Sequence, residues 1–91
     1  MAQLGMDADK VDGIGGQLTA QGGAIQQVIN KIDSLVRDAH ANWKGKDSDD
    51  FNTKWTGSYR KQLMNLMNEV NSLGATAKRN AMRQRDVSNT L

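Results

Sequence analysis

The stretch HANWKGKDSDDF, residues 40–51, lies near the middle of the 91-residue chain, between two long amphipathic segments. Within it, Gly45 can take the positive φ that often follows a helix end, and Asp47 or Ser48 can cap a new helix. Asp47 and Asp50 have the spacing of a weak capping box, and acids favour the positive end of a helix. These stop and start signals predict a tight turn between two helices.

Apolar residues recur at helical spacing on both sides of this turn. Before it they stand in columns seven residues apart, and after it steps of three and four alternate. Such stripes are typical of amphipathic helices that bury one face. The predicted core and dimer stripe consists of Val11, Leu18, Ile25, Val28, Ile29, Ile32, Leu35, Val36, Phe51, Trp55, Tyr59, Leu63, Leu66, Val70 and Leu73.

The chain is therefore expected to form a single all-α domain over residues 1–91, an antiparallel hairpin of two helices. The first helix is expected at about 7–42, the turn at 43–46 and the second helix at about 47–86, with a frayed tail at 87–91. The absence of proline leaves nothing to interrupt long helices. Because most glycines fall in the first 23 residues, the first helix starts weakly and is expected to form when docked.

Two helices cannot enclose a core, so an apolar strip along the hairpin should remain in water. Large exposed apolar strips normally mark interfaces, and two paired hairpins give a four-helix bundle with an interior. A dimer is therefore expected on physical grounds. The sequence leaves homodimer and heterodimer equally open.

The amino-acid composition argues against catalysis and against metal or cofactor sites. The chain has no cysteine and one histidine, His40, so no catalytic, cofactor-binding or metal-ligating residue is assigned. The glycines of DGIGGQLT lack the lysine of a phosphate-binding loop. The acids of DSDD do not have the spacing of an EF-hand and are explained by helix capping. The chain is expected not to be an enzyme.

Charge and hydropathy limit which of the remaining functional classes fit the chain. Residues 58–91 carry six bases against two acids, which leaves a basic nucleic-acid or membrane-surface binder as an alternative without making it the expected function. No apolar run is long enough for stable membrane insertion. The N-terminal residues do not read as a cleavable secretory signal, so the chain is expected to be made in the cytoplasm, and any export would use another route.

The chain contains two Trp-x-Gly strings, and the pattern distinguishes them. Trp55 falls in an apolar column with Phe51 and Tyr59, so it is expected to be a core residue. Trp43 and Gly45 stand where one stripe stops and the next begins. Only this first string coincides with a turn that the flanking stripes independently require.

With Trp43 and Gly45 at its midpoint and an amphipathic helix on each side, the chain resembles the WXG-motif hundred-residue superfamily, the early-secreted-antigen-like proteins of type VII secretion. The resemblance implies a four-helix-bundle dimer, with itself or with a second WXG-type protein. It also implies leaderless export by a machine with a secretion ATPase. The usual Tyr-x-x-x-Asp/Glu export signal is missing after the second helix, and the nearest match is Met82 with Asp86. A cytosolic adaptor or chaperone for a larger type VII effector is the alternative within this resemblance.

Overall fold

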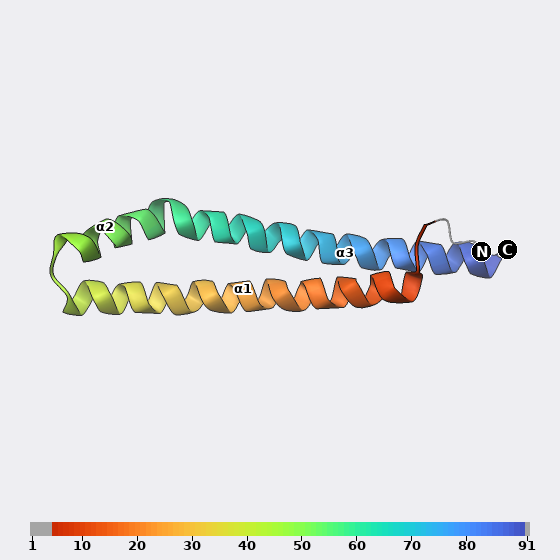
Figure 1. The fold of residues 1–91 in the computed structure, drawn as a ribbon, viewed down its shortest axis with the longest axis horizontal. Helices are drawn as coiled ribbons and strands as arrows, with labels where there is room; N and C mark the ends of the chain where they lie inside the picture. Colours follow the sequence, from red (N-terminus) through yellow and green to blue (C-terminus); the bar gives the residue numbers. More distant parts are fainter. Residues whose placement is uncertain (1–4, 91) are drawn as a thin grey trace. The chain divides into compact units, whose positions relative to one another are not determined.

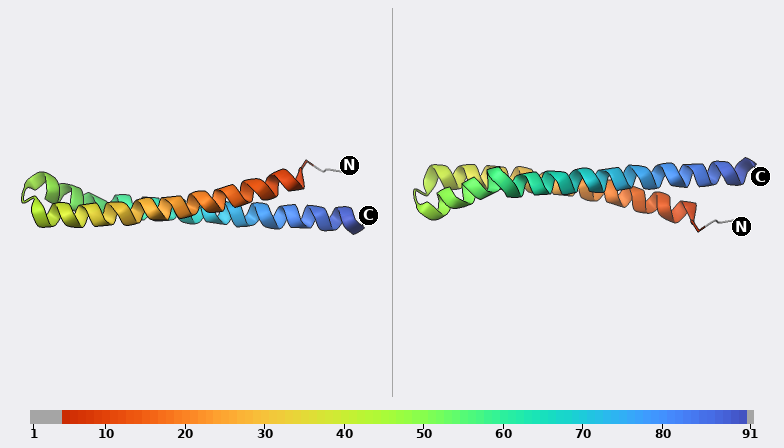
Figure 2. Two further views of the ribbon diagram at one scale, coloured as in Figure 1. Left: turned by 90° about the horizontal axis from the view of Figure 1, so that it is seen from below. Right: turned by 90° about the horizontal axis from the view of Figure 1, so that it is seen from above.

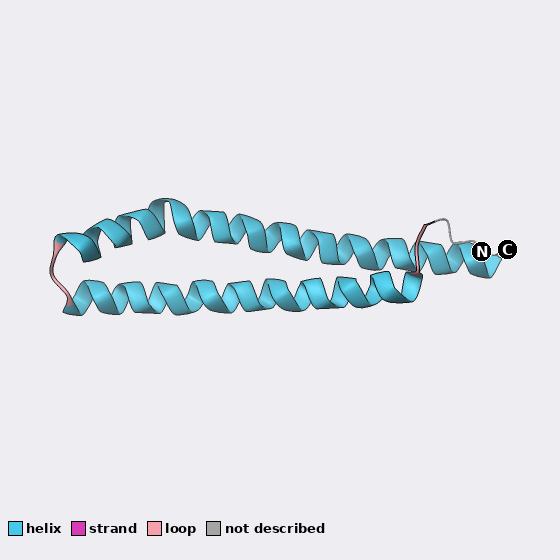
Figure 3. Ribbon diagram, viewed as in Figure 1, coloured by secondary structure: helices cyan, strands magenta, loops and turns pink. Residues whose placement is uncertain are grey.

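The computed structural model describes residues 5–90, and its regular structure is entirely helical (Figures 1 and 3). Helix α1 spans Ala8–Asn42, and helix α2 spans Lys46–Lys54. A short π-helix, η1, spans Trp55–Tyr59 and leads directly into helix α3, Arg60–Thr90. The all-α prediction is confirmed.

The observed helix bounds agree with the predicted ones near the turn and differ from them farther along the chain. Helix α1 begins and ends close to the predicted 7–42, and α2 begins at Lys46 instead of 47. The second helix is divided by a π-helix that the periodicity did not reveal. Helix α3 continues to Thr90, past the predicted end near 86 and through most of the tail that was expected to fray. Leu91 lies outside the described residues.

The start of α2 differs from the predicted cap. Gly45 has φ 176° and ψ 165°, an extended conformation open to any residue, so it does not use the positive φ that a glycine can take. Gly45 itself occupies the N-cap position, and no side chain caps the helix. Its carbonyl accepts a hydrogen bond from the backbone N–H of Asp49 at 3.1 Å. Because the helix already starts at Lys46, Asp47 lies within its first turn, where its charge favours the helix dipole.

The contacts divide into two compact units, of which residues 23–68 form unit 2. This unit is a helical hairpin in which the loop between α1 and α2 reverses the chain (Figure 2). Ile29, Val36 and Trp55 form a cluster of buried side chains in its core. Four partly buried residues pack against this cluster, namely Ile25, Ile32, Leu63 and Met64. The core thus joins α1 to the start of the second helical arm, the continuous helical stretch formed by α2, η1 and α3.

Unit 1 comprises residues 1–22 and 69–91, and its described part is a second antiparallel helix pair. Here glycines allow the helices to approach closely. A Cβ on Gly15 would lie 2.8 Å from the carbonyl oxygen of Gly74, and one on Gly74 would lie 2.9 Å from that of Gly15. A Cβ on Gly22 would overlap the side chain of Asn71. Part of the glycine cluster therefore serves helix packing, whereas a Cβ on Gly13 would meet nothing.

Ion pairs join the same two helices within unit 1. Arg85 Nη2 donates to Asp9 Oδ1 at 2.8 Å and lies 3.5 Å from Asp12 Oδ2. Lys78 Nζ lies 3.6 Å from the other oxygen of Asp12. The hydrogen bond to Asp9 is the main cause that raises the pKa of Arg85 above its ordinary value. All these groups are substantially exposed, so the ion pairs contribute little to stability.

Candidate interaction surface

Trp43 lies in the loop after α1, and its side chain is 55% exposed. Its backbone N–H donates to the carbonyl of Ala39 at 2.7 Å, which continues the helical pattern by one residue. A Cβ on Gly45 would touch the Trp43 indole at 3.5 Å, an ordinary van der Waals distance. The tryptophan is therefore held beside the turn, with much of its ring presented to solvent.

An apolar groove of about 500 Å³ lies next to this tryptophan, entirely within unit 2. It is lined by Ile32, Leu35, Val36, Ala39, Trp43, Asp47, Ser48 and Phe51. Ser48 is 5% exposed, and its hydroxyl oxygen is buried without a hydrogen-bond partner. A buried, unpaired hydroxyl costs about 1–3 kcal/mol. The groove is thus a largely apolar surface whose two polar lining residues, Asp47 and Ser48, both come from the start of α2.

Trp55, by contrast, is buried with 3% of its surface exposed. Its indole Nε1–H donates to Asp33 Oδ1 at 2.8 Å. Arg60 Nε–H donates to both oxygens of the same carboxylate, at 3.0 and 3.1 Å. The hydrogen bonds from Arg60 and then Trp55 lower the pKa of Asp33. The second Trp-x-Gly string is therefore anchored inside unit 2, whereas the first is displayed at the turn.

Replacing Asp33 by alanine is expected to lower the free energy of unfolding by about 1–2 kcal/mol. This is the lower part of the range for hydrogen bonds to charged groups, because the Arg60 side chain is 39% exposed. Urea unfolding at constant protein concentration measures the loss. Asp38→Ala, at an exposed position of the same helix, is the control and should change stability by less than about 0.5 kcal/mol. Equal losses in the two variants would contradict a specific role for Asp33.

This contribution also has a defined pH dependence. Because the folded-state pKa of Asp33 is lowered, the stabilisation is present above its ordinary value of 3.8 and is lost as the pH falls through the folded-state pKa. The stability difference between the parent chain and Asp33→Asn should therefore shrink below about pH 3.8. A difference that stays constant down to pH 2 would contradict the ionised carboxylate.

The predicted stripe divides into residues that the structure buries and residues that it exposes. Buried members are Ile29, Val36 and Trp55, and half-buried members are Val11, Leu18, Ile25, Ile32, Leu63 and Val70. The exposed members are Val28, Leu35, Phe51, Tyr59, Leu66 and Leu73, with exposed fractions between 42% and 57%. The phenylalanine and tyrosine rings lie 6.3 Å apart. Both units thus retain large apolar side chains in contact with solvent.

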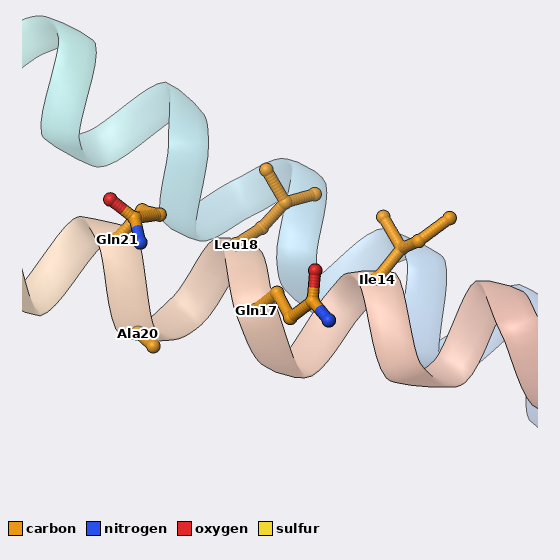
Figure 4. Close-up of a pocket in the computed structure, with 5 residues that line it drawn as sticks. All are labelled: Ile14, Gln17, Leu18, Ala20 and Gln21. Carbon is orange, nitrogen blue, oxygen red and sulfur yellow. The ribbon is translucent and has the colours of Figure 1, made fainter.

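A smaller hollow of about 330 Å³ lies on α1 within unit 1. It is lined by Ile14, Gln17, Leu18, Ala20 and Gln21. Figure 4 shows Ile14 and Leu18, one helical turn apart, pointing to the same side of α1. Ile14 is 52% exposed although it has the size of a core residue. This hollow marks the part of α1 where unit 1 leaves apolar surface uncovered.

Met82 and Asp86 lie on α3 in unit 1, four residues apart and therefore on the same side of the helix. Both residues are exposed, Met82 by 62%. Their position leaves both side chains accessible to a recognising protein. The neighbouring bases Lys78 and Arg85 are engaged with acids of α1, which reduces the free positive charge of this end.

The sequence did not single out the Asp33–Trp55–Arg60 cluster. A signal for it existed, because Asp33 directly follows the apolar Ile32 and precedes the buried Val36 by one helical turn. An acid in such a place usually has a specific partner.

Among the described residues, histidine, aspartate and glutamate nowhere form a group of three that could hold a metal ion. No helix in the described range is sufficiently long and apolar to cross a bilayer.

Comparison with known proteins places these features in a family. The model of the WXG100 family, proteins of 100 residues with WXG, matches residues 3–87. No curated protein and no solved structure shows significant similarity to the chain. Proteins of this family are small, non-enzymatic and secreted by type VII systems. Since the match covers nearly the whole chain and includes the turn tryptophan and both helical arms, the chain belongs to the WXG100 family.

Proposed function

We propose that the chain is exported without a cleavable leader by a type VII secretion system, as a folded dimer that acts through protein–protein contacts. The observation that carries this proposal is the set of exposed apolar residues on helices whose other side is already packed. In unit 2, Ile29 and Val36 are buried on α1, whereas Val28 and Leu35 on the same helix are half exposed. One face of α1 thus meets the second helical arm, and a neighbouring face has no partner within the unit.

A second helical hairpin fits this face in chemistry and in periodicity. Val28 and Leu35 on α1 are seven residues apart, as are Tyr59, Leu66 and Leu73 along the second arm. A seven-residue repeat is the pattern by which helices pack along one another. WXG100 proteins typically form dimers, which supports a four-helix bundle, with itself or with a second WXG-type protein. Covering large apolar side chains with a partner would remove about 25 cal/mol of unfavourable free energy per Å² of apolar area.

The turn region suits recognition by the secretion ATPase or by another component of the machine. Trp43 is exposed beside an apolar groove, and large aromatic residues in such settings often dominate binding energy. Met82 and Asp86 are candidates for a degenerate export signal because both are accessible on one face of α3. Substituting them removes no buried contact, so their role can be tested without disturbing the fold.

Export can be tested by expressing the chain in a bacterium that carries an active type VII system and in a matched strain whose secretion ATPase is inactive. The proposal predicts the chain in the culture supernatant of the active strain only, with an intact mass that shows no N-terminal cleavage. Retention in the cells of both strains would contradict export and would favour a cytosolic adaptor. The double variant Met82→Ala, Asp86→Ala separates the signal from export itself, because unchanged export of this variant assigns recognition to other residues.

A further inference from the structure

We infer that the π-helix Trp55–Tyr59 is a one-residue insertion in a seven-residue repeat, and that it bends the second helical arm so as to open the groove at the turn. The inference concerns the hairpin of unit 2 and does not depend on the proposed export or dimerisation. It rests on the spacing of buried and exposed residues, on the hydrogen bonds around the π-helix, and on the walls of the groove.

The buried side of the second arm shows the insertion directly. Ser48 and Trp55, both buried, are seven residues apart. The next residue on that side is Leu63, which packs against the core cluster and lies eight residues after Trp55. Beyond it, the half-buried Val70 follows at seven residues again. The repeat therefore gains one residue at the π-helix and nowhere else between Ser48 and Val70.

The exposed side shows the same step. Phe51 and Tyr59 are eight residues apart, whereas Tyr59, Leu66 and Leu73 follow one another at intervals of seven. Each of these side chains is between 42% and 57% exposed. In an uninterrupted α-helix, one extra residue would turn the later positions by about 100°. The wider π turn absorbs the extra residue and keeps both sides in register.

Hydrogen bonds hold the insertion at this place. The backbone N–H of Arg60 donates to the carbonyl of Trp55, five residues earlier, which defines the π turn. The carboxylate of Asp33 on α1 accepts from the side chains of these same two residues, at 2.8 Å and 3.0 Å. The hydroxyl of Thr56 donates to the carbonyl of Asn52 at 2.9 Å, a bond that tends to bend helices. Asp33 thus binds the first residue of the π-helix, Trp55, and the residue that directly follows it, Arg60.

The bend has a consequence for the groove. Figure 1 shows the ribbon changing direction at the π-helix, between α2 and the start of α3. Sharp changes of helix direction commonly occur at π-bulges. One wall of the groove comes from α1, through Ile32 and Leu35, and the other from α2, through Ser48 and Phe51. The angle of α2 therefore sets the width of the groove.

Two single-residue deletions test the insertion. Deleting Gly57 should turn the π-helix into regular α-helix and keep both sides in register, because it restores the seven-residue spacing. Trp55 and the former Arg60 would then lie four residues apart, still on one side of the helix and within reach of Asp33. Gly57 is a suitable site because a Cβ there would meet nothing, so the position carries no packing role. Deletion of Asn65, an exposed residue of regular α3, is the matched control and shifts every later residue out of register.

Thermal unfolding followed by circular dichroism should show a cooperative transition for the Gly57 deletion, within a few degrees of the parent chain. The Asn65 deletion should lose cooperative unfolding or melt far lower. Equal destabilisation by the two deletions would overturn the inference that the π-helix is a one-residue insertion, because the π-helix would then be required for folding.

A distance measurement tests the effect on the groove. The chain has no cysteine, so Asp38→Cys and Thr53→Cys place spin labels at exposed positions of α1 and α2 without competing thiols. Labelled protein diluted with an excess of unlabelled protein reports distances within one chain. The Gly57 deletion should shift the mean distance by more than about 1.5 Å, the rise of one helical residue. An unchanged distance in a deletion variant that still folds would overturn the proposed bend.

Discussion

Replacing Trp55 by alanine is expected to destabilise the fold by about 3–5 kcal/mol, the range for large aromatic residues in a core. The indole is 3% exposed, packs with Ile29 and Val36, and donates a hydrogen bond to Asp33. Its removal leaves a cavity in unit 2 and an unfilled site on the carboxylate. Urea unfolding followed by circular dichroism, at one protein concentration, measures the loss.

Trp43→Ala is the matched control, because it removes the same side chain from the other Trp-x-Gly string. With 55% of its surface exposed, Trp43 should contribute less than about 1 kcal/mol to the stability of the chain alone. Its loss should instead reduce export or partner binding. Similar destabilisation by the two substitutions would contradict the distinction between a buried and a displayed tryptophan.

Replacing Gly74 by valine is expected to destabilise the chain by about 1–3 kcal/mol, as overpacking of a close helix contact usually does. A Cβ at this position would lie 2.9 Å from the carbonyl oxygen of Gly15 and 2.8 Å from the hydroxyl of Thr19. The carbonyl belongs to the backbone of α1 and cannot rotate away, so the two helices of unit 1 must separate. Thermal unfolding of the variant measures the effect.

Gly13→Ala provides the control for this substitution. A Cβ there would meet nothing, so only helix propensity changes, and alanine should raise stability by about 0.5–1 kcal/mol. The two glycine variants should therefore differ in sign. If Gly74→Val were as stable as the parent chain, the close approach of the helices would be contradicted.

Much of the fold follows from the sequence because helical periodicity and turn chemistry are local signals. The seven-residue columns before Asn42 and the stop signals around Gly45 predict α1 and the turn within a few residues. The family resemblance rested on Trp43 and Gly45 at that turn, and the family match over residues 3–87 confirms it. The stripe and its exposed strip were predicted, although which members of the stripe are buried and which are exposed was not.

The π-helix and the Asp33 cluster could not be predicted in the same way. Phe51, Trp55 and Tyr59 are spaced by four, which fits a regular helix, so periodicity alone concealed the inserted residue. The inserted residue shows in the eight-residue steps from Phe51 to Tyr59 and from Trp55 to Leu63, which stand out once the exposed and buried sides of the helix are known. The pairing of Asp33 with Arg60 depends on the register between two helices, which a single sequence does not specify. The extended φ of Gly45 could not be predicted either, because glycine permits a left-handed conformation without requiring it.

Sedimentation of the purified chain tests whether the exposed apolar faces of this WXG100 hairpin are covered by a second helical hairpin. A homodimer should sediment as a cooperatively folded species with twice the 10.0 kDa mass of one chain. An obligate heterodimer should give a poorly folded chain that forms a folded one-to-one complex with a second WXG-type protein. Leu66→Asp, which places a charge on the exposed face, should weaken either complex. A 10.0 kDa monomer that melts cooperatively and binds no such partner would show that the exposed apolar faces need no second hairpin.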